Sequence, residues 1–258
     1  MDSSSHDNMS FLEHLEELRW HIIRSLIAII SAGFICFLMK DFIFDTIIFG
    51  PKKMDFPTYK FLCQAATFIG VETTFCGDEF PFIVQNRTMA GQFSAHVMTS
   101  IISGFIISFP YILYEFWKFI SPGLLEKEKA KSRGFIFISS MLFFIGVLFG
   151  YYIISPLSIN FLGTYQVSSQ VLNEIDLGSF ISLVRSSAIA SGIIFGLPII
   201  IYFLTKAGVV TPESLVKYRK YALVLVLVLA AIITPPDVAS QIIVAFPIVV
   251  LYMSLIHI

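Results

Sequence analysis

Charged residues are scarce in this chain of 258 residues: they make up 14%, against about 25% in soluble domains. Hydrophobic residues make up 56%, including 27 phenylalanines, more than a soluble domain could cover in water. The net charge of −1 leaves no uniformly basic face, which argues against nucleic acid as a partner. Together these values are typical of a membrane protein.

Cysteines are equally few, and the motifs of common enzymes are absent. The three cysteines form no CxxC or Cys/His cluster, so we expect no metal site and no cofactor. HExxH, GxSxG, a Walker loop and a pair of intramembrane aspartates are all missing, so we expect no enzyme and no catalytic residue. The acidic, polar amino terminus lacks the apolar core of a cleavable signal peptide.

Six apolar blocks predict an all-α membrane protein with six transmembrane helices. We expect residues 1–9 to be a disordered tail and residues 10–258 to form a single integral membrane domain. Ser10 and Glu13 fit a capping box, so a helix should begin there. Pro110 should kink the second span, and the third should stop near Ser155-Pro156. A helix of about 20 residues crosses the hydrocarbon core, and the predicted spans are about 20–39, 97–119, 134–154, 179–204, 221–233 and 240–256.

The distribution of basic residues predicts the orientation. The loop within Phe116–Arg133 is rich in lysine, and short basic loops stay on the cytoplasmic side. The loop that ends at Gly178 has no Lys or Arg and should lie outside. Both termini are then cytoplasmic. The connection from Lys40 to about His96 is interpreted as a partly folded outer loop with short helices.

Two cysteines lie in that outer loop. Cys63 and Cys76 are 13 positions apart, and a disulfide between them is expected in an oxidising compartment, with two free thiols as the alternative. Such a bond stabilises by roughly 3 kcal/mol at most in the chain-entropy model. Cys36 lies within the first span and should remain a buried thiol.

Acidic residues on the predicted inner face are the most unusual feature. Glu16 and Glu17 near the start, and Glu126 and Glu128 in the basic loop, stand beside membrane-embedded apolar surface. Such a site suits a ligand with adjacent basic residues followed by an apolar segment, because paired arginine–carboxylate bonds are strong and selective. Charge alone also allows solvated acids that offset lysines. A secondary transporter of a small solute and a structural membrane scaffold remain alternatives, although a mid-span carboxylate for ion coupling is missing.

Three separated motifs resemble one family. They are His14-Leu15-xx-Leu18-Arg19, the run from Phe109-Pro110 through Trp117 to Pro122-x-Leu124 with Glu128, and Thr234-Pro235-Pro236-Asp237-xx-Ser240-Gln241. In this order, with six apolar blocks around them, they resemble the TatC family over about Ser10 to Ile256. This family is the multispanning receptor subunit of the twin-arginine protein translocase.

The resemblance implies a function and a set of site residues. The family binds twin-arginine signal peptides of folded precursors. With small single-span partner subunits it moves them across the bacterial inner membrane on the proton-motive force, and it is expected to self-associate in a multimeric receptor complex. By position, Glu17, Arg19 and Glu128 match signal-binding residues, and the matches with structural or partner-contact roles are Pro51, Pro122, Asp237 and Gln241. The family often has acids where Gly196 and Met253 stand here, so the roles of those acids are in doubt.

The first helix of the last hairpin should be too short to cross the bilayer fully. A helix of 13 residues over 221–233 falls about 10 Å short of a hydrocarbon core of ~30 Å. We expect local thinning of the bilayer together with a partner helix. Gln241 could bond across to that partner or satisfy the Thr234–Asp237 turn.

Overall fold

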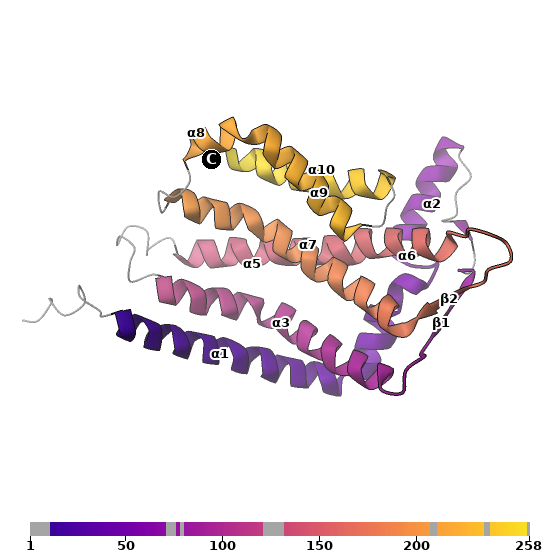
Figure 1. Ribbon diagram of the computed structural model, residues 1–258, viewed down its shortest axis with the longest axis horizontal. Coiled ribbons are helices and arrows are strands. Elements are labelled where there is room, and N and C mark those ends of the chain that lie inside the picture. Colours follow the sequence, from indigo (N-terminus) through magenta and orange to yellow (C-terminus); the bar gives the residue numbers. More distant parts are fainter. Residues whose placement is uncertain are drawn as a thin grey trace, which may run out of the picture. The chain divides into compact units, whose positions relative to one another are not determined.

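The computed structural model describes residues 11–70, 76–77, 80–120, 132–206, 211–234 and 238–256, and most of these are helical (Figure 1). The long and medium helices are α1 (Phe11–Leu38), α2 (Pro57–Ile69), α3 (Gly91–Ile120), α5 (Ser132–Phe149), α6 (Ser155–Thr164), α7 (Leu177–Lys206), α8 (Pro212–Lys217), α9 (Arg219–Ile233) and α10 (Val238–Ile256). Short π and 3₁₀ segments are η1 (Phe42–Ile48), η2 (Gly50–Lys52) and η5 (Gly150–Ile154), and two strands are β1 (Phe82–Gln85) and β2 (Asn173–Asp176).

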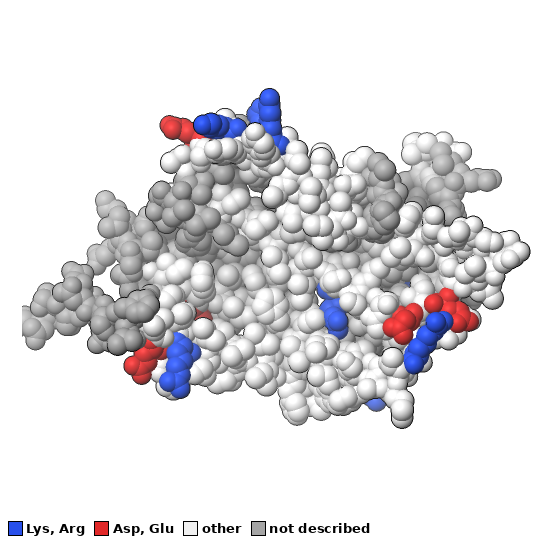
Figure 2. Space-filling view, viewed as in Figure 1, with Lys and Arg blue, Asp and Glu red and all other residues white. Residues whose placement is uncertain are grey.

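Four stretches of described helix are long and apolar enough to cross a membrane: Leu15–Leu38, Gly91–Ile120, Ile136–Thr164 and Leu177–Ile199. They coincide with the first four predicted spans. The second helix continues through Pro110, and Gln241–Met253 is a shorter apolar stretch. Figure 2 shows few charged side chains on the face in view, most of which is white. Long uncharged helices therefore dominate the fold, as composition predicts.

The third apolar helix is longer than predicted. Instead of stopping at Ser155-Pro156, the chain passes through η5 into α6 and ends at Thr164. Pro156 has no N–H to bond the carbonyl four residues earlier, which belongs to Tyr152. The Thr58 hydroxyl, on α2, donates to that carbonyl instead. A side chain from α2 thus replaces the lost backbone bond, and the helix continues.

Two compact units divide the chain: residues 1–39 with 97–141, and residues 40–96 with 142–258. A single domain over residues 10–258 therefore stays a prediction. In the first unit α1 and α3 approach closely through glycines. A Cβ on Gly104 would lie 2.5 Å from the Gly33 nitrogen, and the Ser108 hydroxyl donates to the Ala28 carbonyl at 2.9 Å. Cys36 is buried with a free thiol, as predicted.

The second unit contains strands that the all-α prediction missed. β1 and β2 pair in parallel, with Phe82 opposite Asn173 and Gln85 opposite Asp176. Just past the ladder, the Arg87 guanidinium donates to the Glu174 carboxylate at 2.8 Å. The strands are four residues each and distant in sequence, so neither shows the alternation by which a strand is recognised.

Tyr59 holds three segments of this unit together: α2, η2 and the start of α6. Its side chain is 0% exposed, and its hydroxyl contacts the carbonyls of Pro51 at 2.9 Å and Pro156 at 3.0 Å. Burial raises the pKa of this hydroxyl, which keeps it protonated as a donor. Pro51 is itself buried. Cys63, in the middle of α2, forms the expected disulfide with Cys76, and their Cα atoms are 5.1 Å apart.

Tyr59→Phe is expected to lower the free energy of unfolding by about 1–2 kcal/mol, because it leaves buried carbonyls without their donor. Thermal unfolding of the purified protein in detergent measures the loss. Tyr165→Phe is the matched control, since Tyr165 is 61% exposed and should unfold like the wild type. Equal stability of the Tyr59 and Tyr165 variants would show that the two carbonyl contacts add nothing.

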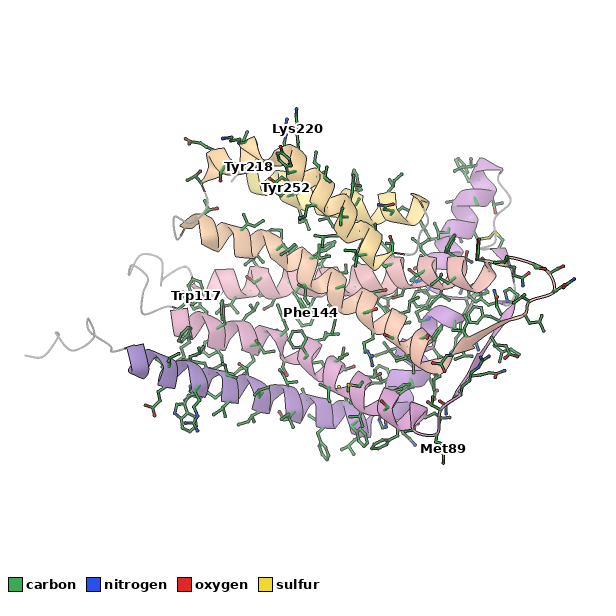
Figure 3. All side chains as sticks on the ribbon, viewed as in Figure 1. Met89, Trp117, Phe144, Tyr218, Lys220 and Tyr252 are labelled. Atoms are coloured by element: carbon green, nitrogen blue, oxygen red, sulfur yellow. A yellow bond between two sulfur atoms is a disulfide. The ribbon has the colours of Figure 1, made fainter. Side chains whose placement is uncertain are left out.

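The α9–α10 hairpin packs on α7 and η5. Its core consists of buried apolar residues: Ile154, Ile194, Phe195, Val226, Ala230, Val244, Ala245 and Ile248. α9 has 15 residues, roughly 22 Å of helix. Gln241 donates through Nε2 to the Leu227 carbonyl of α9 at 3.2 Å, so its described bond lies within the hairpin. Figure 3 shows Tyr218, Lys220 and Tyr252 at the same end of this hairpin, a grouping of aromatic and basic residues typical of a membrane interface.

Candidate functional site at one end of α1 and α3

A polar cluster joins the first turns of α1 to the last turns of α3. It contains His21 and Arg24 from α1 and Glu115 from α3, all within the first compact unit. α1 forms here because apolar residues recur at helical spacing, and α3 because residues Val97–Tyr114 are uncharged. Glu115 is the first charged residue after that stretch, so the fold must supply it with a partner.

The pair of His21 and Glu115 is tight and buried. His21 is 6% exposed and Glu115 is 3% exposed. His21 Nδ1 lies 2.5 Å from Glu115 Oε2. Because the carboxylate oxygen accepts, Nδ1 carries the proton of this bond. The Arg24 guanidinium lies 3.8 Å from the same oxygen but is half-exposed.

Two aromatic residues complete the surroundings of the pair. The Phe119 ring stands edge-on to the His21 ring, with centroids 6.0 Å apart. Tyr111 lies one turn before Glu115, on the same face of α3. A buried carboxylate is costly unless it is paired and hydrogen-bonded. Here it has an imidazole and a nearby guanidinium, so the cluster fixes α1 against α3 at this end.

The predicted signal-binding residues of α1 lie beside this cluster. Glu17 is one helical turn before His21, on the same face, and is half-buried. Arg19 is exposed. Within the part of the chain that the structure describes, neither side chain forms an ion pair. Glu17 thus places an unpaired carboxylate next to a rigid helix contact, an arrangement that can accept a cationic ligand.

None of the remaining predicted site residues is described within this compact unit. Glu128, Pro122 and Asp237 lie outside the described residues. Pro51 and Gln241 belong to the second compact unit, where Pro51 accepts from Tyr59 and Gln241 donates to α9. At Gly196, where the family often has an acid, an added Cβ would meet nothing within 4 Å.

His21 and Glu115 were not among the predicted site residues. The signal that finds them is the position of Glu115 after an uncharged helical stretch, because an ionisable residue near the end of an apolar span is expected to have a partner. The partner itself could not be found from sequence, because His21 is 94 positions away.

Comparisons with known proteins agree along the whole chain. A family model described as Sec-independent protein translocase protein (TatC) matches residues 13–247. A Sec-independent protein translocase protein TatC from Blattabacterium sp. subsp. Periplaneta americana (strain BPLAN) is 46% identical over 253 residues, covering 98% of this chain and 95% of that protein. The one from Aquifex aeolicus (strain VF5) is 36% identical, covering 95% and 92%.

A solved structure shares the fold. The crystal structure of a twin arginine translocase receptor, TatC in DDM, superposes with a TM-score of 0.72 at 34% sequence identity, covering 95% of this chain and 98% of that chain.

Proposed function

Because the chain belongs to the TatC family of Sec-independent protein translocase proteins, we propose that it is the receptor subunit that binds twin-arginine signal peptides of folded precursor proteins. The family is a non-enzymatic component of a protein translocase in bacterial membranes, and several helices of this chain are apolar enough to cross one. A solved relative of the same fold is described as a twin arginine translocase receptor.

The observation that carries the proposal is the state of Glu17. It is half-buried, unpaired among the described residues, and one turn from the rigid contact of His21 with Glu115. A half-buried carboxylate binds a guanidinium more strongly than an exposed one, because solvent screens it less. Glu128 supplies the second carboxylate of the proposed site, and Arg19 flanks it. Two arginine–carboxylate pairs and burial of the apolar part of the signal then act together.

The proposed topology has six spans with both termini in the cytoplasm of a bacterial cell, in the inner membrane. Arg19, Arg24 and Lys118 at one end of α1 and α3 support this orientation, because basic residues collect on the cytoplasmic side. The residues between α6 and α7, which include Glu174 and Asp176 but no Lys or Arg, support an outer position for the opposite end. α9, with 15 residues, is the short fifth span, and α10, with 19 residues, is the sixth.

We further propose that small single-span subunits complete the translocase, that several receptor copies associate, and that the proton-motive force drives transport. Short α9 supports a partner helix beside the hairpin, since a thin region of bilayer favours association. Asp237 and Gln241 are the proposed contacts. The bond of Gln241 to the Leu227 carbonyl is long at 3.2 Å, so a partner helix could compete for its amide.

The test is binding of a fluorescent twin-arginine signal peptide to the purified receptor in detergent. Glu17→Gln and Glu128→Gln are each expected to weaken binding about fivefold to tenfold, and the double variant about fiftyfold, because each loses a charge-assisted bond. Added salt should weaken binding to the wild type more than to the double variant. Glu16→Gln is the matched control, since Glu16 is an exposed acid on the same helix.

Normal affinity of the double variant would refute the assignment of these two acids. Transport of a small solute by vesicles that contain this chain without its small partner subunits would favour the alternative of a secondary transporter, because a receptor alone should move nothing.

A further inference from the structure

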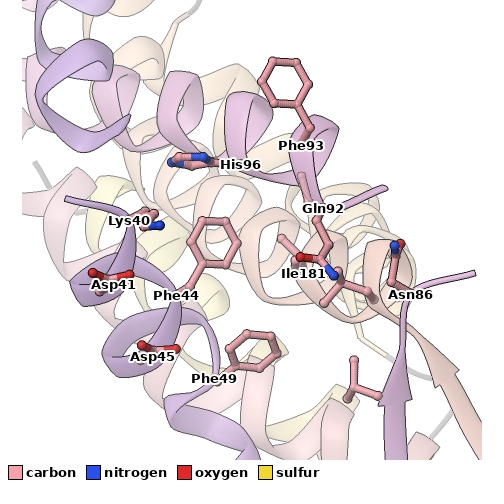
Figure 4. A pocket seen from close by; sticks show the side chains of 13 residues that line it. Lys40, Asp41, Phe44, Asp45, Phe49, Asn86, Gln92, Phe93, His96 and Ile181 are labelled. Carbon is pink, nitrogen blue, oxygen red and sulfur yellow. The ribbon is translucent and has the colours of Figure 1, made fainter. Parts of the chain in front are cut away.

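A pocket of about 510 Å³ lies in the second compact unit, whereas Glu17 belongs to the first. One wall of the pocket is formed by residues of η1 and those just before and after it. The other walls are formed by the end of β1 and by the first turns of α3 and α7 (Figure 4). Its volume is within the range of about 300–1,000 Å³ that small-molecule sites occupy. The residues that carry the argument are Lys40, Asp41, Asp45, Phe44, Gln92 and His96.

The sequence on either side of the pocket places it at a membrane surface. Lys40 ends an uncharged stretch that runs over residues 25–39, and His96 precedes the uncharged residues 97–114. Charged and polar residues at the ends of such stretches lie at the level of lipid headgroups. A pocket lined by both residues is therefore at the level of lipid headgroups.

The charges of the pocket are of both signs and are available. Lys40 supplies a cation, while Asp41 and Asp45, four residues apart beside and within η1, supply two carboxylates. All three side chains are exposed, and none forms an ion pair among the described residues. A simple anion would be repelled by the two carboxylates, and a simple cation by the lysine. The charges fit a ligand that is itself a zwitterion.

Aromatic contacts hold the floor of the pocket in place. The Phe44 ring stands edge-on to the His96 ring with centroids 5.6 Å apart, and the Phe49 ring stacks on Phe180 at 5.6 Å. Phe93, on the first turn of α3, also lines the pocket (Figure 4) and is 68% exposed. A preformed polar site beside an exposed apolar residue suits a molecule with a polar head and apolar chains.

We propose that this pocket binds the headgroup of an aminophospholipid, with its phosphate at Lys40 and its primary ammonium between Asp41 and Asp45. A primary ammonium has three N–H donors for two carboxylates, whereas a quaternary ammonium has none. The amide of Gln92 can donate to the phosphate. The acyl chains lie against Phe93 and the apolar start of α3. The leaflet follows from the proposed topology and is the outer one; binding itself does not depend on that topology or on signal recognition.

The experiment is native mass spectrometry of the detergent-purified full chain after addition of dioleoyl phosphatidylethanolamine or phosphatidylcholine at equal concentration. The wild type is expected to retain the ethanolamine lipid about fivefold more, the order of one charged contact at a partly exposed site. Asp41→Asn with Asp45→Asn should bring the ratio close to one. Lys40→Gln should lower retention of both lipids, because both carry the phosphate.

The matched control is Glu213→Gln with Lys217→Gln, which removes one acid and one base from exposed positions on α8. This control should retain lipids like the wild type. Glycerophosphoethanolamine, the same headgroup without acyl chains, should not displace the lipid at equal concentration; displacement would overturn a membrane lipid as the ligand. Equal retention of the two lipids by the wild type, or discrimination that persists without the two aspartates, would overturn the proposed site.

Discussion

Glu115→Ala is expected to destabilise the protein by about 3–5 kcal/mol, the usual cost of removing one partner of a buried pair. The substitution leaves the His21 imidazole, 6% exposed, without its acceptor, and leaves a cavity between α1 and α3. Thermal unfolding in detergent should show the loss as a large drop in Tm. Because Glu17 is one turn from His21, signal-peptide affinity should fall as well.

Two further variants separate charge from packing at this pair. Glu115→Gln keeps an acceptor for His21 and should lose less stability than Glu115→Ala. The double variant His21→Phe with Glu115→Leu replaces the pair by apolar side chains and should recover most of the stability, since such replacements are often neutral or better. If that apolar pair binds signal peptide like the wild type, the cluster serves only to hold the helices together. Wild-type stability of Glu115→Ala would contradict its role altogether.

Gly104→Ala is expected to cost about 3 kcal/mol, at the upper end of the range for overpacking. The added Cβ would lie 2.5 Å from the Gly33 nitrogen and 2.6 Å from the Ile29 carbonyl oxygen. Both are backbone atoms of α1, so no side chain can move aside and the helices must separate. Folded yield and Tm in detergent measure the effect.

Gly134→Ala is the control for this substitution in the same unit. Its Cβ would meet nothing within 4 Å, and alanine in an open helical position should stabilise by about 0.5–1 kcal/mol. Similar Tm values for the two alanine variants would mean that the close approach of α1 and α3 at Gly104 is not needed for folding.

The four long apolar helices were predictable because hydrophobic length is a local property of the chain. Residues 25–39 and 97–114 are uncharged whatever surrounds them, and a helix is the simplest structure that satisfies their backbone in lipid. The family was predictable for a similar reason, since its motifs are short runs such as His14-Leu15-xx-Leu18-Arg19. The disulfide of Cys63 with Cys76 joins two cysteines that are only 13 positions apart in one connection between predicted spans.

The errors arose where distant residues decide a local outcome. Ser155-Pro156 reads as the end of a helix, yet the helix continues because Thr58 donates to the carbonyl that the proline leaves unpaired. β1 and β2 have no strand pattern of their own and exist through pairing across about 90 positions of sequence. Gln241 has its described bond to Leu227 of the neighbouring helix, and its contact with a partner helix stays a prediction.

Sequence by itself therefore determined the class of the protein, its apolar helices and its family. It also determined that acidic residues such as Glu17 lie close in sequence to basic residues at the ends of apolar helices. Tertiary structure alone decided that Glu115 is buried against His21, that Glu17 remains unpaired beside them among the described residues, and that Lys40, Asp41 and Asp45 share a pocket with His96. The physical reason is the distance along the chain over which each effect acts. The length of an apolar stretch and the distribution of basic residues are properties of one segment, whereas the pairing of buried charges depends on which segments pack together.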